Sequence, residues 1–170
     1  DFQFKTTIEK LWSALTDSNQ LSKWVADIHT GEGMENNFKP VVGHRFQFRA
    51  RPTEYWNGII EGEVLVVEEP HRLSYTWESG EKHTVTWTLT DLGNGMVNLH
   101  LEQTGISGEP ARNGARYGWG KWGESLKKLL ERLIDEGVHG APAQRGDAQM
   151  QRFPLQLVPD LLQADGHGLP

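Results

Sequence analysis

Apolar and polar residues alternate along several stretches of the chain, which is the pattern of a β-strand with one buried and one exposed face. The alternation is cleanest at residues 84–90, where valine, tryptophan and leucine are separated by threonines. Turn sequences rich in glycine separate this stretch from its neighbours at residues 79–81 and 93–95. We therefore expect strands over residues 1–5, 45–49, 58–69, 72–78, 83–91 and 96–105.

A helical period of three to four residues occurs in three other places. The longest apolar stripe lies at residues 117–134 and comprises Trp119, Trp122, Leu126, Leu129, Leu130, Leu133 and Ile134. Shorter stripes predict a helix at residues 8–15, capped by Thr6 and Thr7, and a second short helix at residues 20–25. Residues 27–40 and 107–113 are expected to be loops.

Glycines crowd the start of the long helix, where each costs up to about 1 kcal/mol relative to alanine. Gly114, Gly118, Gly120 and Gly123 alternate with aromatic residues there. One interpretation is close packing of the helix on a sheet, and the other is room left for a ligand. We expect any ligand-facing surface within residues 117–123 and ordinary core in the later half of the helix.

The order of elements predicts an α+β fold. A sheet with one apolar face needs a cover, and a long amphipathic helix needs a partner for its stripe. We expect a helix-grip fold, in which a curved six-stranded antiparallel sheet wraps around the long C-terminal helix and two short helices follow the first strand. The predicted domain spans residues 1–136. Residues 137–170 are predicted to be an extension, a linker followed by a short apolar segment.

The composition narrows the classes of partner. The 170 residues carry a net charge of −6, seven tryptophans and no cysteine. Because no long basic run is present, neither nucleic acid nor a membrane surface is expected as a partner. The longest apolar run, residues 64–67, is far too short to span a membrane. The lack of cysteine excludes disulfides and thiolate chemistry and is compatible with the cytosol, so we expect a cytoplasmic protein.

Several short motifs occur in a fairly specific order within residues 1–136. They are TIEKLWSALTD at 7–17, LSKW at 21–24, PVVG at 40–43, GEV at 62–64, EPHRLSYTW at 69–77, TWTLT at 86–90 and GW at 118–119. This order resembles the helix-grip, START-like (SRPBCC) superfamily, which includes START domains, the major birch-pollen allergens and bacterial polyketide aromatase/cyclases. Within it, the chain is similar to the homologues of the heat-shock-protein-90 ATPase activator, C-terminal domain type.

The resemblance implies a curved sheet gripping the helix, usually around an apolar cavity, but it does not imply one activity. Members bind lipids, flavonoids, hormones or polyketides, a few are enzymes, and the namesake stimulates a chaperone. The chain departs from many relatives at Gln103, where they carry histidine, and this removes one titrating group from the expected cavity. The extension after Gly137 has no family counterpart.

Groups with catalytic or metal-binding spacing are not found in the sequence. The seven histidines lie scattered, mostly in loops or on predicted polar faces, so we expect no catalytic residue, metal or cofactor. Glu61 and Glu63 share a strand face, which we interpret as a solvated sheet edge and not as an acid–base pair. We interpret Arg45, Arg49 and Arg51 as solvated ion-pair partners, with anion recognition at a cavity mouth as the alternative.

The candidate cavity lining follows from strand parity and the helix stripe. It combines apolar and aromatic side chains with one inward amide, a mixture that suits a flat apolar ligand. Trp24 and Trp56 lie in or beside loops and are the candidate gates. The predicted lining is Trp24, Phe46, Phe48, Val64, Val66, Tyr75, Trp77, Val85, Trp87, Leu99, Leu101, Gln103, Tyr117, Trp119, Trp122 and Leu126.

Three functions stay open. The first is non-catalytic binding of a small hydrophobic or aromatic molecule between sheet and helix, which predicts a closed cavity. The second is a protein-interaction or chaperone-activator-like module, which predicts a filled interior and an exposed apolar patch. The third is a cyclase- or hydrolase-type enzyme, which would need inward acid–base groups. A homodimer could form through the apolar segment at residues 153–162.

Overall fold

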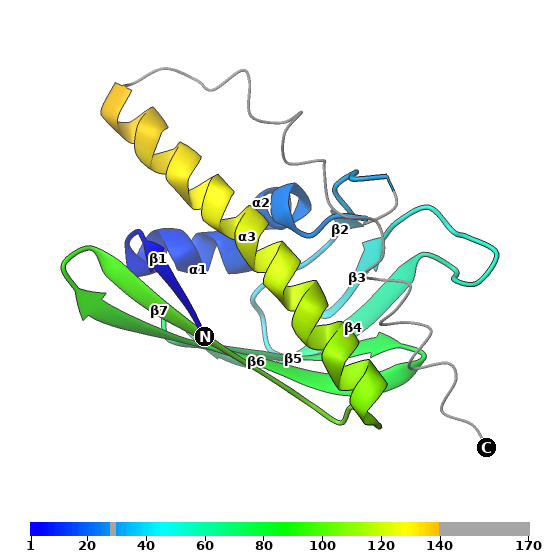
Figure 1. Cartoon of the computed structure of the whole chain (residues 1–170). Helices are drawn as coiled ribbons and strands as arrows, with labels where there is room; N and C mark the ends of the chain where they lie inside the picture. The colour runs from blue at the N-terminus through cyan, green and yellow to red at the C-terminus, as the bar shows by residue number, and fades with distance from the viewer. Residues whose placement is uncertain (28–29, 140–170) are drawn as a thin grey trace.

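Strands with alternating sequence and a long amphipathic helix produce an α+β fold in the computed structural model, which describes residues 1–27 and 30–139 (Figure 1). Figure 1 shows the long helix lying across the curled sheet, with the two short helices beside it. The elements are β1 (Phe2–Lys5), α1 (Ile8–Thr16), α2 (Ser18–Trp24), β2 (Glu35–Asn36), β3 (Arg45–Arg49), β4 (Ile59–Glu68), β5 (Arg72–Ser79), β6 (Glu81–Gly93), β7 (Met96–Thr104) and α3 (Glu109–His139).

The sheet is antiparallel throughout, in the order β1-β7-β6-β5-β4-β3-β2. The helix-grip architecture expected from the sequence is confirmed, with a seventh strand added to the expected six. This strand, β2, lies inside the segment predicted to be a loop and pairs over only two residues, Glu35 with Arg49 and Asn36 with Phe48. A pairing this short leaves no periodic pattern in the sequence.

A bulge in β4 changes which side chains face the helix. Val64 pairs with Tyr75, but the register then shifts, so that Val66 pairs with Ser74 and Val67 with Leu73. Because directly opposed residues share a face, Val67 joins the core side and Val66 turns to the outer side. Val66 was predicted to line the cavity from simple alternation, and the bulge makes that prediction wrong.

The helix α3 begins at Glu109, eight residues before the predicted apolar stripe and inside the segment predicted to be a loop. Glu109 is an acidic residue in the first turn, and its negative charge interacts favourably with the positive end of the helix dipole. The predicted loop at residues 107–113 is therefore mostly helical. Among the described helices, none is long and apolar enough to cross a membrane. Most of the predicted extension, residues 140–170, lies outside the described residues, so the domain boundary and the dimer contact through 153–162 stay predictions.

Candidate functional site

The middle of the interface between sheet and helix, where a closed cavity was predicted, is filled by aromatic rings. Trp119 on α3 lies at the centre, with ring centroids 5.4 Å from Trp77, 5.3 Å from Trp87 and 5.0 Å from Trp122. Most of the predicted lining belongs to this buried core and packs ring against ring or chain. These residues are Trp24, Phe46, Phe48, Val64, Tyr75, Trp77, Val85, Trp87, Leu99, Trp122 and Leu126.

One predicted lining residue, Tyr117, lies outside this core, and Trp24, which was also a candidate gate, lies within it. Tyr117 is 48% exposed, and the Lys121 Nζ lies 5.7 Å from its ring centroid. It points away because two helical residues span about 200°, so Tyr117 and Trp119 occupy opposite sides of α3. Trp24 is buried, and its indole Nε1 donates a 2.8 Å hydrogen bond to the Ala14 carbonyl. This contact makes Trp24 part of the core and not a gate.

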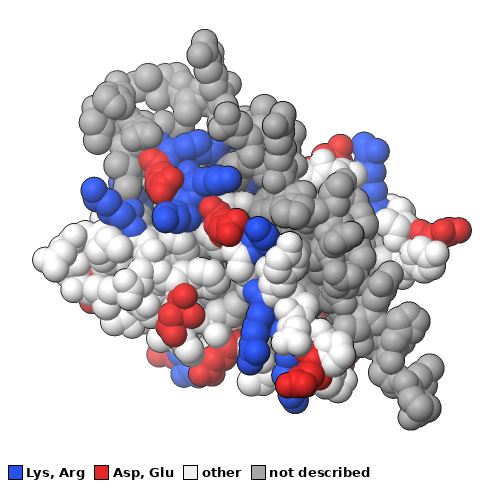
Figure 2. Space-filling model, viewed as in Figure 1, with Lys and Arg blue, Asp and Glu red and all other residues white. Residues whose placement is uncertain are grey.

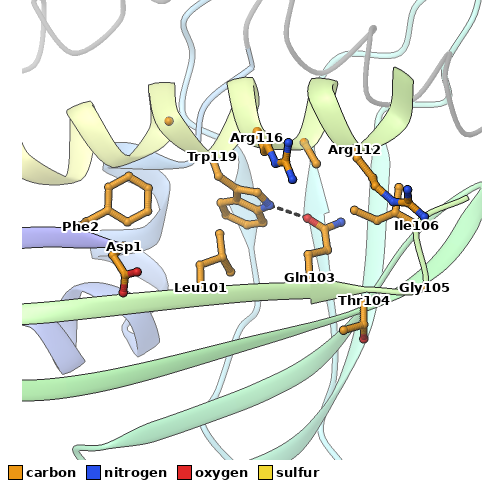
Figure 3. Close-up of a pocket in the computed structure, with 12 residues that line it drawn as sticks. Asp1, Phe2, Leu101, Gln103, Thr104, Gly105, Ile106, Arg112, Arg116 and Trp119 are labelled. Atoms are coloured by element: carbon orange, nitrogen blue, oxygen red, sulfur yellow. Dashed lines mark hydrogen bonds between the residues drawn. The ribbon is translucent and has the colours of Figure 1, made fainter. Parts of the chain in front are cut away.

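Beside the aromatic core lies a cleft of about 690 Å³. It opens between the first half of α3, the end of β7 and the start of β1 (Figure 3). Three of the predicted lining residues face it: Leu101, Gln103 and Trp119. The complete lining is Asp1, Phe2, Leu101, Gln103, Thr104, Gly105, Ile106, Arg112, Ala115, Arg116, Trp119 and Gly120.

The helix side of this cleft was missed in the sequence because the helix was expected to begin too late. Arg112, Arg116 and Gly120 follow one another at intervals of four residues, and Ala115 precedes Trp119 by four. These spacings continue the face that carries Trp119 towards the start of α3. The signal was therefore present, but it fell in a segment assigned to a loop.

The two glycines that bracket Trp122 on α3 have different surroundings. A Cβ atom placed on Gly123 would lie 2.4 Å from Cε1 of Phe2, so this glycine permits close contact between α3 and β1. A Cβ on Gly120 would meet no atom within 4 Å, because Gly120 lines the cleft. Gly123 thus shows the close packing of the first interpretation, and Gly120 borders open space, which the second interpretation requires.

A chain of hydrogen bonds runs from the cleft into the sheet. The Trp119 Nε1 donates to Gln103 Oε1 at 2.6 Å, the Gln103 Nε2 lies 2.7 Å from His83 Nδ1, and His83 Nε2 lies 3.0 Å from Glu81 Oε2. An indole N–H only donates, so Gln103 must present its oxygen to Trp119 and its NH₂ to His83. His83 Nδ1 is then an acceptor, and Nε2–H donates to Glu81. The Ser107 amide also donates to this carboxylate, at 3.4 Å.

His83 corrects one expectation from the sequence. It pairs with Trp77 and is buried on the inner face of β6, although the histidines were thought to lie mostly in loops or on polar faces. The parity of Val85, two residues later, was the signal that would have placed it there. An inward imidazole therefore stands next to Gln103. Both of its ring nitrogens are engaged, however, and it does not line the cleft.

Electrostatic effects at the buried polar groups have clear causes. The hydrogen bond from His83, helped by that from Ser107, lowers the pKa of the Glu81 carboxyl from 4.5 to about 2. Burial raises the pKa of the Tyr75 phenol well above its usual range. The Tyr75 oxygen accepts a 2.7 Å hydrogen bond from Trp87 Nε1, which satisfies both polar groups inside the core.

Of the three arginines expected to be solvated ion-pair partners, Arg45 and Arg51 pair with carboxylates, whereas Arg49 contacts a neutral side chain. Arg45 lies 3.4 Å from Glu63, and Arg49 donates to the Gln47 side chain. Glu61 accepts a 2.8 Å hydrogen bond from the Gln47 amide. Arg51 likewise pairs with a carboxylate, at 3.3 Å. Among the described residues, no group of three or more His, Asp or Glu side chains lies close enough to hold a metal ion.

Comparisons with known proteins agree with this fold. The model of the family "Activator of Hsp90 ATPase homolog 1-like protein" matches residues 5–131. The crystal structure of MLL2253 from Mesorhizobium loti is 36% identical over 77% of this chain and 95% of that one, with a TM-score of 0.64. No curated protein matched.

Two more distant structures share the fold alone. PFC0360w, an HSP90 activator from Plasmodium falciparum, is 19% identical over 82% of this chain and 93% of its own, with a TM-score of 0.55. DynU16, a protein of the dynemicin biosynthetic locus, is 19% identical over 76% of this chain and 45% of its own, with a TM-score of 0.61. From the family model and the similarity to MLL2253, the chain belongs to the family of Activator of Hsp90 ATPase homolog 1-like proteins.

Proposed function

We propose that this chain binds a small, largely apolar molecule in the cleft between α3 and β7, without catalysing a reaction. The observation that carries the proposal is the space beside Trp119, where Gly120 leaves the helix surface open. The volume of about 690 Å³ lies in the range of small-molecule sites. Phe2, Leu101 and Ile106 supply apolar surface around it.

The polar groups of the cleft suit recognition better than catalysis. Gln103 is held by Trp119 and His83, so its amide has a fixed direction at the cleft wall. A fixed amide can form one oriented hydrogen bond with a ligand at low entropic cost. His83, the inward imidazole, is separated from the cleft by Gln103, and its Nε2–H donates a hydrogen bond to Glu81. This arrangement supports binding over the cyclase- or hydrolase-type hypothesis.

The test uses N-phenyl-1-naphthylamine, an uncharged fluorescent probe. We expect it to bind the wild-type protein and to bind G120L at least about tenfold more weakly, because a leucine side chain would occupy the space beside Trp119. K128L is the matched control, since it adds the same side chain to an exposed position of α3 outside the cleft. Equal affinity of wild type and G120L would refute the proposal. If G120L does weaken binding, native mass spectrometry of protein from its own host would identify the natural ligand.

A second candidate is a chaperone-activator-like module, and the filled interior favours it. The rings around Trp119 close the middle of the interface, as expected for a domain that acts through its surface. The family model and the structural likeness to an HSP90 activator supply the class of partner. The measurement is the ATPase rate of the Hsp90 protein from the same host with and without this chain. An unchanged rate at saturating concentration would count against this function.

A further inference from the structure

Two arginines at one end of the cleft have no partner in the described part of the chain. Arg112 and Arg116 lie one turn apart on α3, and both line the cleft. Neither makes a side-chain hydrogen bond or ion pair with any residue in 1–27 or 30–139. In Figure 3, Arg116 extends from the helix towards Gln103, and Arg112 lies beside Ile106.

These arginines differ from others in the same protein. Arg45, Arg51 and Arg72 each have a carboxylate within 3.4, 3.3 and 3.8 Å, respectively. In a chain with a net charge of −6, acidic groups are abundant enough to pair with exposed arginines. Two guanidinium groups left unpaired on the same cleft wall therefore form a local positive site. Figure 2 shows Lys and Arg side chains along the exposed side of α3, with Asp and Glu side chains among them.

The opposite end of the cleft does not supply the missing negative charge. Asp1 lines that end, but its carboxylate accepts hydrogen bonds from Asn98 at 3.1 Å and lies 3.0 Å from His100 Nδ1. Between the two ends lie Phe2 and Trp119, which offer ring surface. The cleft thus has a cationic end, an aromatic middle and an acidic end whose carboxylate is already hydrogen-bonded within the protein.

We propose that the ligand of this cleft is an amphipathic anion, whose flat apolar body lies against Trp119 and whose carboxylate or similar group is held by Arg112 and Arg116. This inference rests on the proposed binding function and specifies the chemical class of the ligand. Guanidinium groups donate in a planar fork that matches a carboxylate, so the pair can hold it from two sides. The position of Arg112 in the first turn of α3 adds the favourable potential of the helix N-terminus.

The experiment compares two probes with one skeleton. 1-Anilinonaphthalene-8-sulfonate is the anionic counterpart of N-phenyl-1-naphthylamine, so the pair isolates the contribution of the charge. Both are titrated against wild type, R112Q/R116Q and K127Q/K128Q. The last variant removes two positive charges from exposed positions of α3 outside the cleft and controls for net charge.

We expect the wild type to bind the sulfonate more tightly than the neutral probe. R112Q/R116Q should lower the affinity for the sulfonate by about five- to tenfold and leave the neutral probe within about twofold. K127Q/K128Q should leave the affinities for both probes unchanged. In competition, 1-naphthoate should displace the neutral probe better than 1-naphthalenemethanol. If the neutral probe binds and R112Q/R116Q affects both probes equally, the arginine site is refuted while the binding function stands. If neither probe binds the wild type, both proposals fall.

Discussion

The same substitution at two glycines of α3 should stabilise the protein at Gly120 but not at Gly123. Replacing a helical glycine by alanine stabilises a helix by about 1 kcal/mol. In G120A nothing opposes this gain, because the added Cβ meets no atom within 4 Å. In G123A the Cβ would lie 2.4, 2.9 and 3.0 Å from three ring atoms of Phe2. Overpacking of this kind costs about 1–3 kcal/mol. We therefore expect G123A to range from neutral to about 2 kcal/mol less stable than wild type.

The assay is urea unfolding followed by tryptophan fluorescence, with thermal unfolding as a second measurement. The two variants should differ by about 1–3 kcal/mol, which for a chain of this size corresponds to several degrees in Tm. Adding F2A removes the obstructing ring, so the penalty of G123A should disappear in the F2A background. If G123A is as stable as G120A, or if its penalty persists without the Phe2 ring, the assigned contact between α3 and β1 is wrong.

Three further predictions test individual features. The substitution E81Q removes the carboxyl group whose pKa is lowered in the folded protein. A carboxyl whose folded pKa is about 2 stabilises the fold above its ordinary value of 4.5 and loses this contribution as the pH falls towards 2. The stability difference between wild type and E81Q should therefore shrink over that window, and a constant difference in urea titrations would contradict it. Q103L leaves the Trp119 indole N–H unpaired and should cost about 1–3 kcal/mol in urea unfolding. V64T places a hydroxyl in the core and should cost about 1–3 kcal/mol, whereas V66T on the outer face should stay within about 0.5 kcal/mol. Equal costs would argue against the β4 bulge.

Much of the fold could be predicted because local sequence and tertiary environment agree. The threonine-spaced strand β6 and the long stripe of α3 each have one apolar face, and the turns before and after β6 carry glycine. The sequence therefore predicted that the apolar face of the sheet packs against the apolar stripe of the helix. The bulge after Val64 could not be predicted, because nothing in four consecutive apolar residues indicates which one leaves the ladder.

The candidate site was predicted only in part, for a different reason. Alternation identifies the inward face of a strand, but it does not say whether facing side chains fill the space between them. Here the rings of Trp77, Trp87 and Trp122 meet Trp119 and fill it, so the open volume moves to the end of β7. Leu101 and Gln103 were found because they lie at that end. The arginines were missed with the early turns of α3.

The cleft also joins parts of the chain that are far apart in sequence. Two walls come from Asp1 and from Phe2 in the edge strand β1, which pairs with β7, whereas the remaining walls come from residues 101–120. A ligand that contacts both sides would hold β1 in place at this edge of the sheet. Its binding should slow amide hydrogen exchange in β1, where the pairing is short, and leave exchange between β4 and β5 unchanged. The amide exchange rate of β1 would then report whether a ligand occupies the cleft.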